Sequence, residues 1–392
     1  MKLEIIFQKK TLTTIAVLFS AICVGCVPNI SFSRELELNR TVTEYVETNS
    51  KQINNSQLQT VLDKAVEDLE IPGAVMYISG PKGTWVGASG YSDLESETLM
   101  KPNDRLALAS VSKTFVGVAV LKLVEQGQLN LDESINKYLP KDISRNIRYS
   151  DEITVRQLLN HTSGIVDYLD DNFAELTEAR SRSRPWKARE VIKLIYGEPQ
   201  GKPGGKHDYS NSNYILLELI VEEKTGKSLA EVIRKQILNP IDLKNTFTEL
   251  IENNSTSIVT GYSDINEDGV LNSHKGLNEG NGLGDGGLIS NAMDTAKFID
   301  ALVAEKTLLS PQILKEMLTF IPTGEGDGYG LGIARFQTQA GEAIGHDGSS
   351  YGFVSLMLYY PDEKIAAVVL VNQDGDFTEE ILDRGLKVYR QS

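Results

Sequence analysis

The chain has 392 residues, of which 41% are hydrophobic, so it is long enough to bury a substantial core in one large domain or two ordinary ones. Its formal net charge of −15 argues against a nucleic-acid-binding protein, because a phosphate-binding surface needs clustered lysine and arginine. The only two cysteines, Cys23 and Cys26, lie near the N-terminus. We therefore predict no disulfide and no thiol nucleophile in the folded domain. Because the chain also has only four histidines and no His-Glu-x-x-His motif, we predict no metal site, and we expect no cofactor.

The N-terminus has the pattern of an export signal. Three lysines among the first ten residues precede the apolar run 14–24, and Gly25 then precedes Cys26. The stretch Val24-Gly25-Cys26 is similar to a lipoprotein cleavage site, from which Cys23 departs, and the Cys-x-x-Cys spacing alone does not predict redox chemistry. We predict that residues 1–26 direct export to the cell envelope or periplasm and that a lipid on Cys26 anchors the chain to a membrane. The polar residues 27–55 are predicted to form a linker.

The folded domain is expected to cover residues 56–392. Helical periodicity over 58–69 ends at Pro72-Gly73, and the runs 74–79 and 84–88 predict a β-hairpin. An almost wholly apolar run at 114–124 predicts a buried helix, followed by a loop at 129–140 and a short helix at 153–160. Further helices are predicted at 187–196, 212–224, 229–238, 294–303 and 311–318.

The C-terminal part is β-rich and ends in a helix. Strands are predicted at 329–336, 352–360 and 365–371, before a last helix at 377–389. Two early and three late strands predict an α/β (α+β) fold in which both chain ends form one five-stranded antiparallel sheet flanked by helices. We place an α/β lobe at 56–128 and 290–392, a mainly helical inserted lobe at 129–289, and the functional site between the lobes.

Ser110 and Lys113 stand at the start of the predicted buried helix. Lys113 follows Ser110 by three residues, so both side chains lie on the same helical face. In so apolar a setting a lysine loses hydration, which disfavours its charged form and makes it a candidate proton acceptor beside a hydroxyl. The alternative is a helix-capping serine followed by a lysine that reaches solvent.

Two other motifs resemble a catalytic or a metal-binding site, but we predict neither function for them. The stretch Gly348-Ser349-Ser350-Tyr351-Gly352 matches a Gly-x-Ser-x-Gly nucleophile elbow, but a strand follows it, and no histidine follows His346, so we predict a turn between strands. The stretch Asp264–Gly269 opens like a calcium loop, but Lys275 stands where the bidentate carboxylate belongs. An acidic turn is predicted there.

Two polar segments matter only in combination. Tyr209-x-Asn211 follows a glycine-rich loop and precedes a predicted helix, which a cap alone would explain. His346-Asp347-Gly348 follows Gly345 where two strands are joined, which a turn would explain.

Taken together and in this order, Ser110-x-x-Lys113, Tyr209-x-Asn211 and His346-x-Gly348 resemble three motifs of a family of serine acyl-transferases. That family includes class C β-lactamases and penicillin-sensitive D-alanyl-D-alanine carboxypeptidases. The resemblance runs from about Ser56 to the C-terminus and includes the landmarks 153–164 and 284–288. It implies the two-lobed β-lactamase/transpeptidase-like fold.

The resemblance also implies roles for these residues. Ser110 would be the nucleophile, and either Lys113 or Tyr209 would accept its proton, the two being coupled. Asn211 would hold the amide group of the substrate and orient Lys113. The backbone N–H groups of Ser110 and Ser349 would form an oxyanion hole.

His346 occupies the place where β-lactamases use lysine and where the carboxypeptidases and several esterases also use histidine. His346, Asp347 and Gly348 would contact substrate, whereas His161 is interpreted as structural. Family members that bind a substrate carboxylate usually place a hydroxyl residue at the position of Asp347, and an aspartate there would repel such an anion.

We therefore expect an exported serine hydrolase that forms an acyl-enzyme on Ser110, in the manner of a D-alanyl-D-alanine carboxypeptidase. Its partner would be a small-molecule or peptide substrate. An esterase or weak β-lactamase of the same fold is the enzymatic alternative. A non-catalytic envelope protein that binds peptidoglycan or a partner is the alternative from another class.

Overall fold

The computed structural model describes residues 54–169, 186–198, 200–252, 258–264, 269–274, 283–324 and 326–392, all within the unit Glu47–Ser392. The predicted export signal, Cys26 and nearly all of the predicted linker lie outside these residues, as do residues 265–268 of the predicted acidic turn. Among the described residues, no helix combines the length and the apolar character that crossing a membrane would require.

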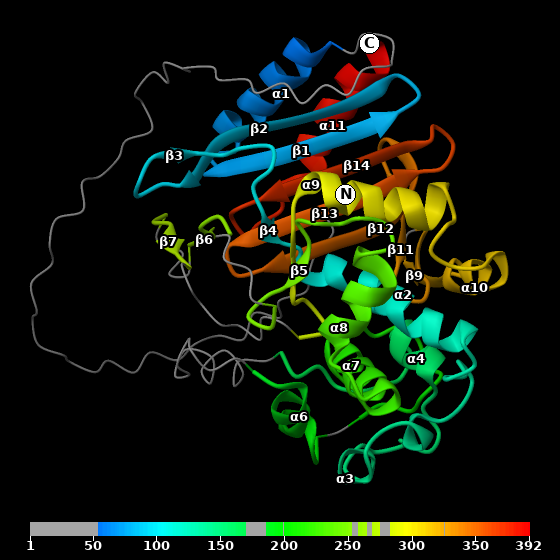
Figure 1. Ribbon diagram of the computed structural model, residues 1–392. Coiled ribbons are helices and arrows are strands. Elements are labelled where there is room, and N and C mark those ends of the chain that lie inside the picture. The colour runs from blue at the N-terminus through cyan, green and yellow to red at the C-terminus, as the bar shows by residue number, and fades with distance from the viewer. Residues whose placement is uncertain are drawn as a thin grey trace, which may run out of the picture. The chain divides into compact units, whose positions relative to one another are not determined.

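The molecule is built on a nine-stranded antiparallel sheet with the order β3-β2-β1-β14-β13-β12-β11-β10-β9 (Figure 1). An early strand pairs with the last one, Ala74 opposite Val371, so both chain ends do form one sheet. The strands are β1 (Gly73–Gly80), β2 (Gly83–Asp93), β3 (Thr98–Leu99), β9 (Ile321–Gly324), β10 (Asp327–Tyr329), β11 (Ala334–Thr338), β12 (Gly341–Ser350), β13 (Phe353–Tyr360) and β14 (Ile365–Val371).

The predicted number of five strands is wrong, and β12 is the most important omission. Its segment 345–348 joins two predicted strands, which a turn would explain, and glycine and aspartate are depleted in strands. In the structure β12 pairs with β11 on one side and β13 on the other, and this tertiary context outweighs the weak local preference. The predicted strand 329–336 is also divided, because the chain turns at Gly332, whose φ is +83°.

Two apolar clusters lie on opposite faces of the sheet. Along β14, Ala367, Val369 and Val371 belong to one cluster, whereas Ala366, Val368 and Leu370 belong to the other. This alternation follows from the period of two in a β-strand, and burial on both faces explains the continuous apolar sequence of β14.

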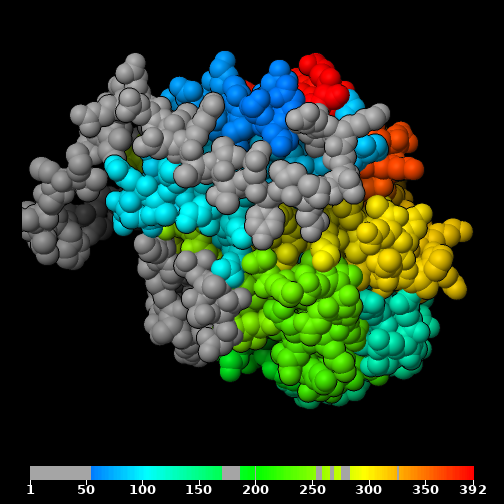
Figure 2. All heavy atoms as spheres, turned by 45° about the horizontal axis from the view of Figure 1, so that its top comes forward, coloured from blue at the N-terminus to red at the C-terminus, as the bar shows by residue number. Residues whose placement is uncertain are grey.

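Helices cover both faces. On one face α1 (Asn55–Asp68) and α11 (Thr378–Gln391) pack side by side against the sheet, and Figure 2 shows them adjacent at the surface. On the other face α9 (Ala292–Ile299) packs on β14, β1 and β13. Below it in Figure 1 lie the helices of the inserted segment.

The inserted segment is mainly helical, as predicted. Its helices α7 (Ser212–Thr225) and α8 (Leu229–Ile233) pack on α2 (Ser112–Glu125), which is buried along most of its length. Phe115 of α2 stacks face to face on Phe298 of α9 with ring centroids 3.5 Å apart. Two predicted helices end in π-helical turns, at Arg234–Leu238 and Asp300–Ala304, and the helix predicted at 187–196 ends in a 3-10 helix. The other α-helices are α3 (Lys141–Ser144), α4 (Val155–Leu159), α6 (Ala188–Val191) and α10 (Pro311–Met317).

Two small sheets complete the fold, and neither was predicted. The strands β4 (Leu106–Ala107), β8 (Leu288–Ser290) and β5 (Phe247–Thr248) form one of them, and β4 is the last strand before α2. The strands β6 (Tyr262–Ser263) and β7 (Asn272–Ser273) form the other. The proposed lobe boundaries remain predictions.

Candidate active site

Ser110 lies on a short 3-10 helix, η1 (Ala109–Val111), that leads into α2. The preceding Ala109 has φ of +45°, a left-handed conformation that costs free energy for a residue with a Cβ atom. Ser110 is partly exposed, whereas Lys113, one turn later, is fully buried. The start of α2 therefore presents the serine to solvent while keeping the lysine beneath it.

The amino group of Lys113 is surrounded by three oxygen acceptors. Its Nζ lies 3.0 Å from Ser110 Oγ, 2.7 Å from Asn211 Oδ1 and 2.5 Å from the backbone oxygen of Asp285. Burial lowers the pKa of Lys113 to about 8, and the negative charge of Asp285 opposes this shift. With this pKa roughly a tenth of the amine is neutral at pH 7, and the neutral fraction rises with pH. The amine lies within hydrogen-bond distance of the serine hydroxyl.

Tyr209 and Asn211 reach this centre from the segment before α7. The centroid of the Tyr209 ring lies 5.1 Å from Lys113 Nζ, and the Tyr209 hydroxyl interacts with the Ser110 side chain. Desolvation raises the pKa of Tyr209 well above its usual range, so the phenol is protonated at neutral pH. Tyr209 remains 37% exposed, which leaves it open to a bound substrate.

His161 supports Tyr209 from below. The two rings stack with centroids 4.2 Å apart, and His161 Nδ1 accepts a hydrogen bond from the Ser210 backbone N–H at 3.1 Å. Burial lowers the pKa of His161 well below its usual range, so the ring is neutral. The contacts place a neutral ring against Tyr209, and the structural role of His161 stays a prediction.

His346 lies on β12 with its side chain only 2% exposed. A carbonyl oxygen only accepts, so Nδ1 donates to the Asp347 backbone oxygen at 2.6 Å, and Nε2 accepts from the Tyr329 hydroxyl at 2.8 Å. Burial lowers the pKa of His346. The ring is therefore a neutral, fixed wall of the site, with its centroid 6.5 Å from that of Tyr209.

The backbone of β12 lies directly against the start of η1. A Cβ atom placed on Gly348 would lie 2.5 Å from the Leu108 backbone oxygen and 2.9 Å from the Ser110 backbone nitrogen, so a glycine is required at this contact. Pairing with β11 ends at Gly345, while pairing with β13 continues to Ser350. In the described part of the chain, residues 346–350 therefore have one strand edge without a strand partner, next to Ser110.

Asp347 follows His346 on β12, and its carboxylate stays close to the His346 ring. Its side chain is 52% exposed, and its Oδ1 lies 3.6 Å from His346 Nδ1. Burial lowers the pKa of Lys113, and the Asp347 carboxylate opposes this shift. Desolvation raises the pKa of Tyr209, and the Asp347 carboxylate adds to that increase. The predicted substrate-contacting aspartate is thus a half-exposed negative charge near the buried lysine.

Three contacts of the site escaped prediction. Asp167 accepts two hydrogen bonds from Asn211, Tyr329 holds His346, and Asp285 offers its backbone oxygen to Lys113. Asp285 belongs to a landmark of the family resemblance, which gave a signal for its position but not for its contact. Nothing in the local sequence marks the other two.

The remaining motifs do not join this site. Ser350 ends β12 in the Gly-x-Ser-x-Gly stretch, and no helix follows it as a nucleophile elbow would need. Asp264 accepts a hydrogen bond from the Gly269 backbone N–H at 2.8 Å. Within the described ranges, no group of three or more histidine, cysteine, aspartate or glutamate residues could hold a metal ion.

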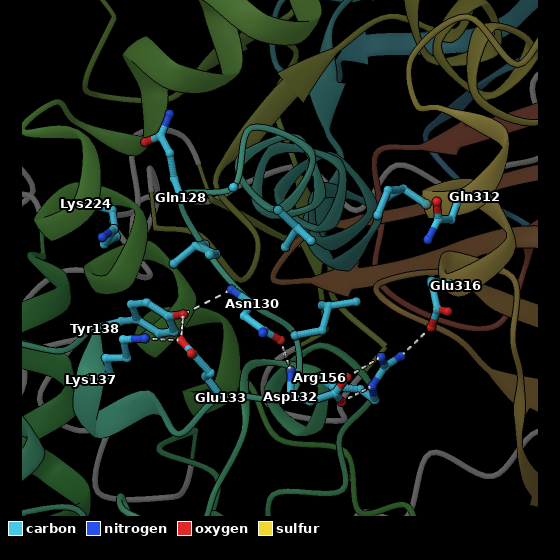
Figure 3. A pocket seen from close by; sticks show the side chains of 15 residues that line it. Gln128, Asn130, Asp132, Glu133, Lys137, Tyr138, Arg156, Lys224, Gln312 and Glu316 are labelled. Atoms are coloured by element: carbon cyan, nitrogen blue, oxygen red, sulfur yellow. Dashed lines mark hydrogen bonds and ion pairs between the residues drawn. The ribbon is translucent and has the colours of Figure 1, made fainter.

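A cavity of about 610 Å³ lies elsewhere, beyond the C-terminal end of α2 (Figure 3). None of the predicted site residues lines it. Most of its charged groups pair with one another: Arg156 lies 2.6 Å from Asp132 and 2.8 Å from Glu316, and Lys137 lies 2.6 Å from Glu133. The centre around Ser110, not this cavity, is the candidate active site.

Comparisons with relatives extend over most of the chain. The model of the beta-lactamase family matches residues 58–389. A penicillin-binding protein of Bacillus subtilis strain 168 is 26% identical over 352 residues, which cover 83% of this chain and 73% of that protein. Protein flp of Staphylococcus aureus strain MW2 is 30% identical over 211 residues, which cover 53% of this chain and only 41% of the relative.

Solved structures agree on the fold. A D-stereospecific amidohydrolase from Streptomyces sp. is 27% identical with a TM-score of 0.73, over 86% of this chain and 98% of that one. The D-amino acid amidase from Ochrobactrum anthropi SV3 in complex with L-phenylalanine amide has a TM-score of 0.74 at 24% identity, over the same shares of 86% and 98%. The match of the family model over residues 58–389 shows that this chain belongs to the beta-lactamase family of serine hydrolases.

Proposed function

We propose that this chain hydrolyses its substrate through an acyl-enzyme on Ser110, in the manner of a D-alanyl-D-alanine carboxypeptidase acting on cell-wall peptides. The observation that carries the proposal is the buried amino group of Lys113, 3.0 Å from Ser110 Oγ and with its pKa lowered to about 8. A desolvated amine beside a partly exposed hydroxyl is an arrangement that activates a nucleophile.

Acylation begins when Ser110 Oγ attacks the substrate carbonyl carbon and loses its proton. Lys113 is the better placed acceptor, because burial favours its neutral amine, whereas desolvation keeps Tyr209 as a phenol. The bond between the carbonyl carbon and the leaving nitrogen then breaks. Tyr209 passes a proton to that nitrogen, and the Lys113 ammonium returns one to the Tyr209 phenolate. Attack by water on the ester completes the cycle.

The negative charge that develops on the carbonyl oxygen needs donors. The backbone N–H groups of Ser110 and Ser349 are proposed to supply them, and the close approach of Gly348 to the Ser110 nitrogen brings their segments together. Asn211 would bind the amide group of the substrate. Neutral His346 would line the position where an extended substrate runs beside the free edge of β12.

Asp347 favours a second candidate within the same chemistry: hydrolysis of amides or esters that carry no carboxylate near the scissile bond. The half-exposed Asp347 carboxylate would repel the C-terminal carboxylate of a D-alanyl-D-alanine peptide. Two structural neighbours are named as a D-stereospecific amidohydrolase and a D-amino acid amidase, which agrees with this candidate.

Replacing Asp347 with threonine is expected to raise kcat/KM about tenfold for a peptide ending in D-alanyl-D-alanine, because it removes a like charge from the subsite of the substrate carboxylate. Steady-state kinetics should compare that peptide with a neutral short-chain ester, for which little change is expected. An unchanged ratio between the two substrates would show that Asp347 does not select substrate charge.

Covalent labelling tests the proposed function. After incubation with a fluorophosphonate or with penicillin, intact mass spectrometry should show one adduct, and peptide mapping should place it on Ser110. Ser350→Ala, the serine of the Gly-x-Ser-x-Gly stretch, is the matched control and should label like the wild type. Absence of an adduct from both probes would favour the non-catalytic binding protein, and an adduct on another residue would displace Ser110 as the nucleophile.

Export and anchoring complete the proposal. The basic start, the apolar run 14–24 and Val24-Gly25-Cys26 support an exported chain held in the cell envelope by a lipid on Cys26. Such an anchor would place the active site where cell-wall peptides are found.

A further inference from the structure

The carboxylate of Asp167 accepts hydrogen bonds from both the backbone and the side chain of Asn211. Its Oδ1 accepts hydrogen bonds from the backbone N–H groups of Asn211 at 3.1 Å and Leu169 at 3.2 Å, and its Oδ2 accepts one from Asn211 Nδ2 at 2.8 Å. Asp167 comes from the loop after α4, so two separate segments meet here. The contact gives Asn211 a neighbour that can only accept hydrogen bonds.

This contact determines which way the Asn211 amide faces. An ionised carboxylate attracts the NH₂ group of an amide and repels its oxygen, so Nδ2 faces Asp167. The amide oxygen must then face the opposite way, where Oδ1 lies 2.7 Å from Lys113 Nζ. The charge of Asp167 thereby fixes an acceptor, and not a donor, beside the lysine.

The orientation of the amide matters most when Lys113 is neutral. A neutral amine has two N–H donors and one lone pair. Asn211 Oδ1 and the Asp285 backbone oxygen take the two donors, so the lone pair is left for the hydroxyl proton of Ser110. A reversed amide would instead donate from Nδ2 to the lone pair and leave Lys113 unable to accept a proton from Ser110.

We propose that Asp167 is a positioning residue for acylation, which holds the Asn211 amide so that the lone pair of Lys113 points at Ser110. The inference rests on the proposed function, in which Lys113 takes the serine proton. It assigns to Asp167 a role in the reaction without contact to the substrate.

Other ionisable groups around Lys113 define the pH range of the test. Burial lowers the pKa of His161 and His346, so both rings are neutral near pH 7, and it raises the pKa of the Tyr209 and Tyr214 phenols. Burial raises the pKa of Asp167 to about 6. The carboxylates that favour the lysine ammonium are Asp285, Asp167 and Asp347.

Asp167→Asn is the decisive variant. Its amide oxygen can stay with the two backbone N–H donors, and its NH₂ group then faces Asn211 and favours the reversed amide. The rate constant for labelling by a fluorophosphonate should be measured from pH 5 to pH 10. We expect its high-pH plateau to fall at least tenfold, and its midpoint to move below the wild-type value near pH 8, because a charge that favours the ammonium is lost.

Two further variants make the test specific. Asp208→Asn removes the same charge from an exposed neighbour of Tyr209 and should leave plateau and midpoint unchanged. The double variant Asp167→Asn with Asn211→Asp returns an acceptor to Lys113, and it should recover labelling because a fluorophosphonate has no amide for Asn211 to bind. Thermal unfolding should be measured for the single variant. If the single variant is unfolded, the labelling rate of the double variant still tests the inference.

Each result decides the matter. A wild-type plateau and midpoint in Asp167→Asn would overturn the inference, as would a double variant no faster than the single one. A lower plateau with an unmoved midpoint would reduce Asp167 to a structural role. An unlabelled wild-type protein would instead overturn the proposed function itself.

Discussion

Ser110→Ala is expected to lower kcat/KM by a factor on the order of 10⁴ to 10⁶, the range found when a catalytic serine is removed. The Ser110 hydroxyl lies 3.0 Å from the Lys113 amine and interacts with the Tyr209 side chain. Alanine leaves that base and that acid in place without a nucleophile between them. Hydrolysis of a neutral ester, followed over hours at high enzyme concentration, would measure the residual rate.

Folding is not expected to account for this loss. Ser110 is partly exposed, and alanine keeps the backbone N–H groups that the oxyanion hole requires. Thermal unfolding of the variant should therefore stay close to that of the wild type, and Ser350→Ala should retain the wild-type rate. A Ser110→Ala protein that still hydrolysed the ester within tenfold of the wild type would contradict an acyl-Ser110 intermediate.

Sequence patterns predicted those parts of the fold that local apolar runs determine. The buried helix α2 and the strand β14 are continuous apolar stretches, and their burial on several sides leaves no ambiguity. β12 was missed because its Gly345-His346-Asp347-Gly348 segment has little strand preference of its own. Its strand conformation comes from β11 and β13, which contribute partners that no local window contains.

The same distinction separates the predicted and the missed parts of the site. Ser110, Lys113, Tyr209 and Asn211 were found because a family resemblance fixes their order and spacing, and the structure brings them together. The acceptor from Asp285 is a backbone oxygen, a group that every residue carries. Its identity therefore depends on where the chain folds and not on the side chain.

Asp167 has no local signal in the sequence. It lies 44 positions before Asn211 in the loop after α4, and its sequence neighbours do not mark it as part of the site. Only the meeting of that loop with the start of α7 turns an ordinary aspartate into a partner of the Asn211 amide.

Lys113→Met should slow acylation by about 10² to 10⁴, the contribution of a positioned general base. Methionine fills the space of the lysine stem but leaves the Asn211 and Asp285 oxygens without their donor, so some loss of stability is expected and thermal unfolding should be recorded. Stopped-flow or mass-spectrometric measurement of the fluorophosphonate labelling rate isolates the acylation step.

Lys113→Arg distinguishes the two possible roles of the lysine. A guanidinium keeps the positive charge but does not give up its proton, so it cannot act as a base. If Lys113 accepts the serine proton, the arginine variant will be as slow as the methionine variant. If the lysine acts only as a cation that favours a Tyr209 phenolate, arginine will retain much of the rate, and Tyr209→Phe will be the more damaging change.

The pH profile of the wild-type protein supplies an independent sign. As pH rises through about 8, the pKa to which burial lowers Lys113, the ammonium gives way to the amine. A base must be unprotonated, so the acylation rate should rise across this interval and then level off. A required cation would give the opposite slope, with the rate falling above pH 8, and that result together with an active Lys113→Arg variant would transfer the role of base to Tyr209.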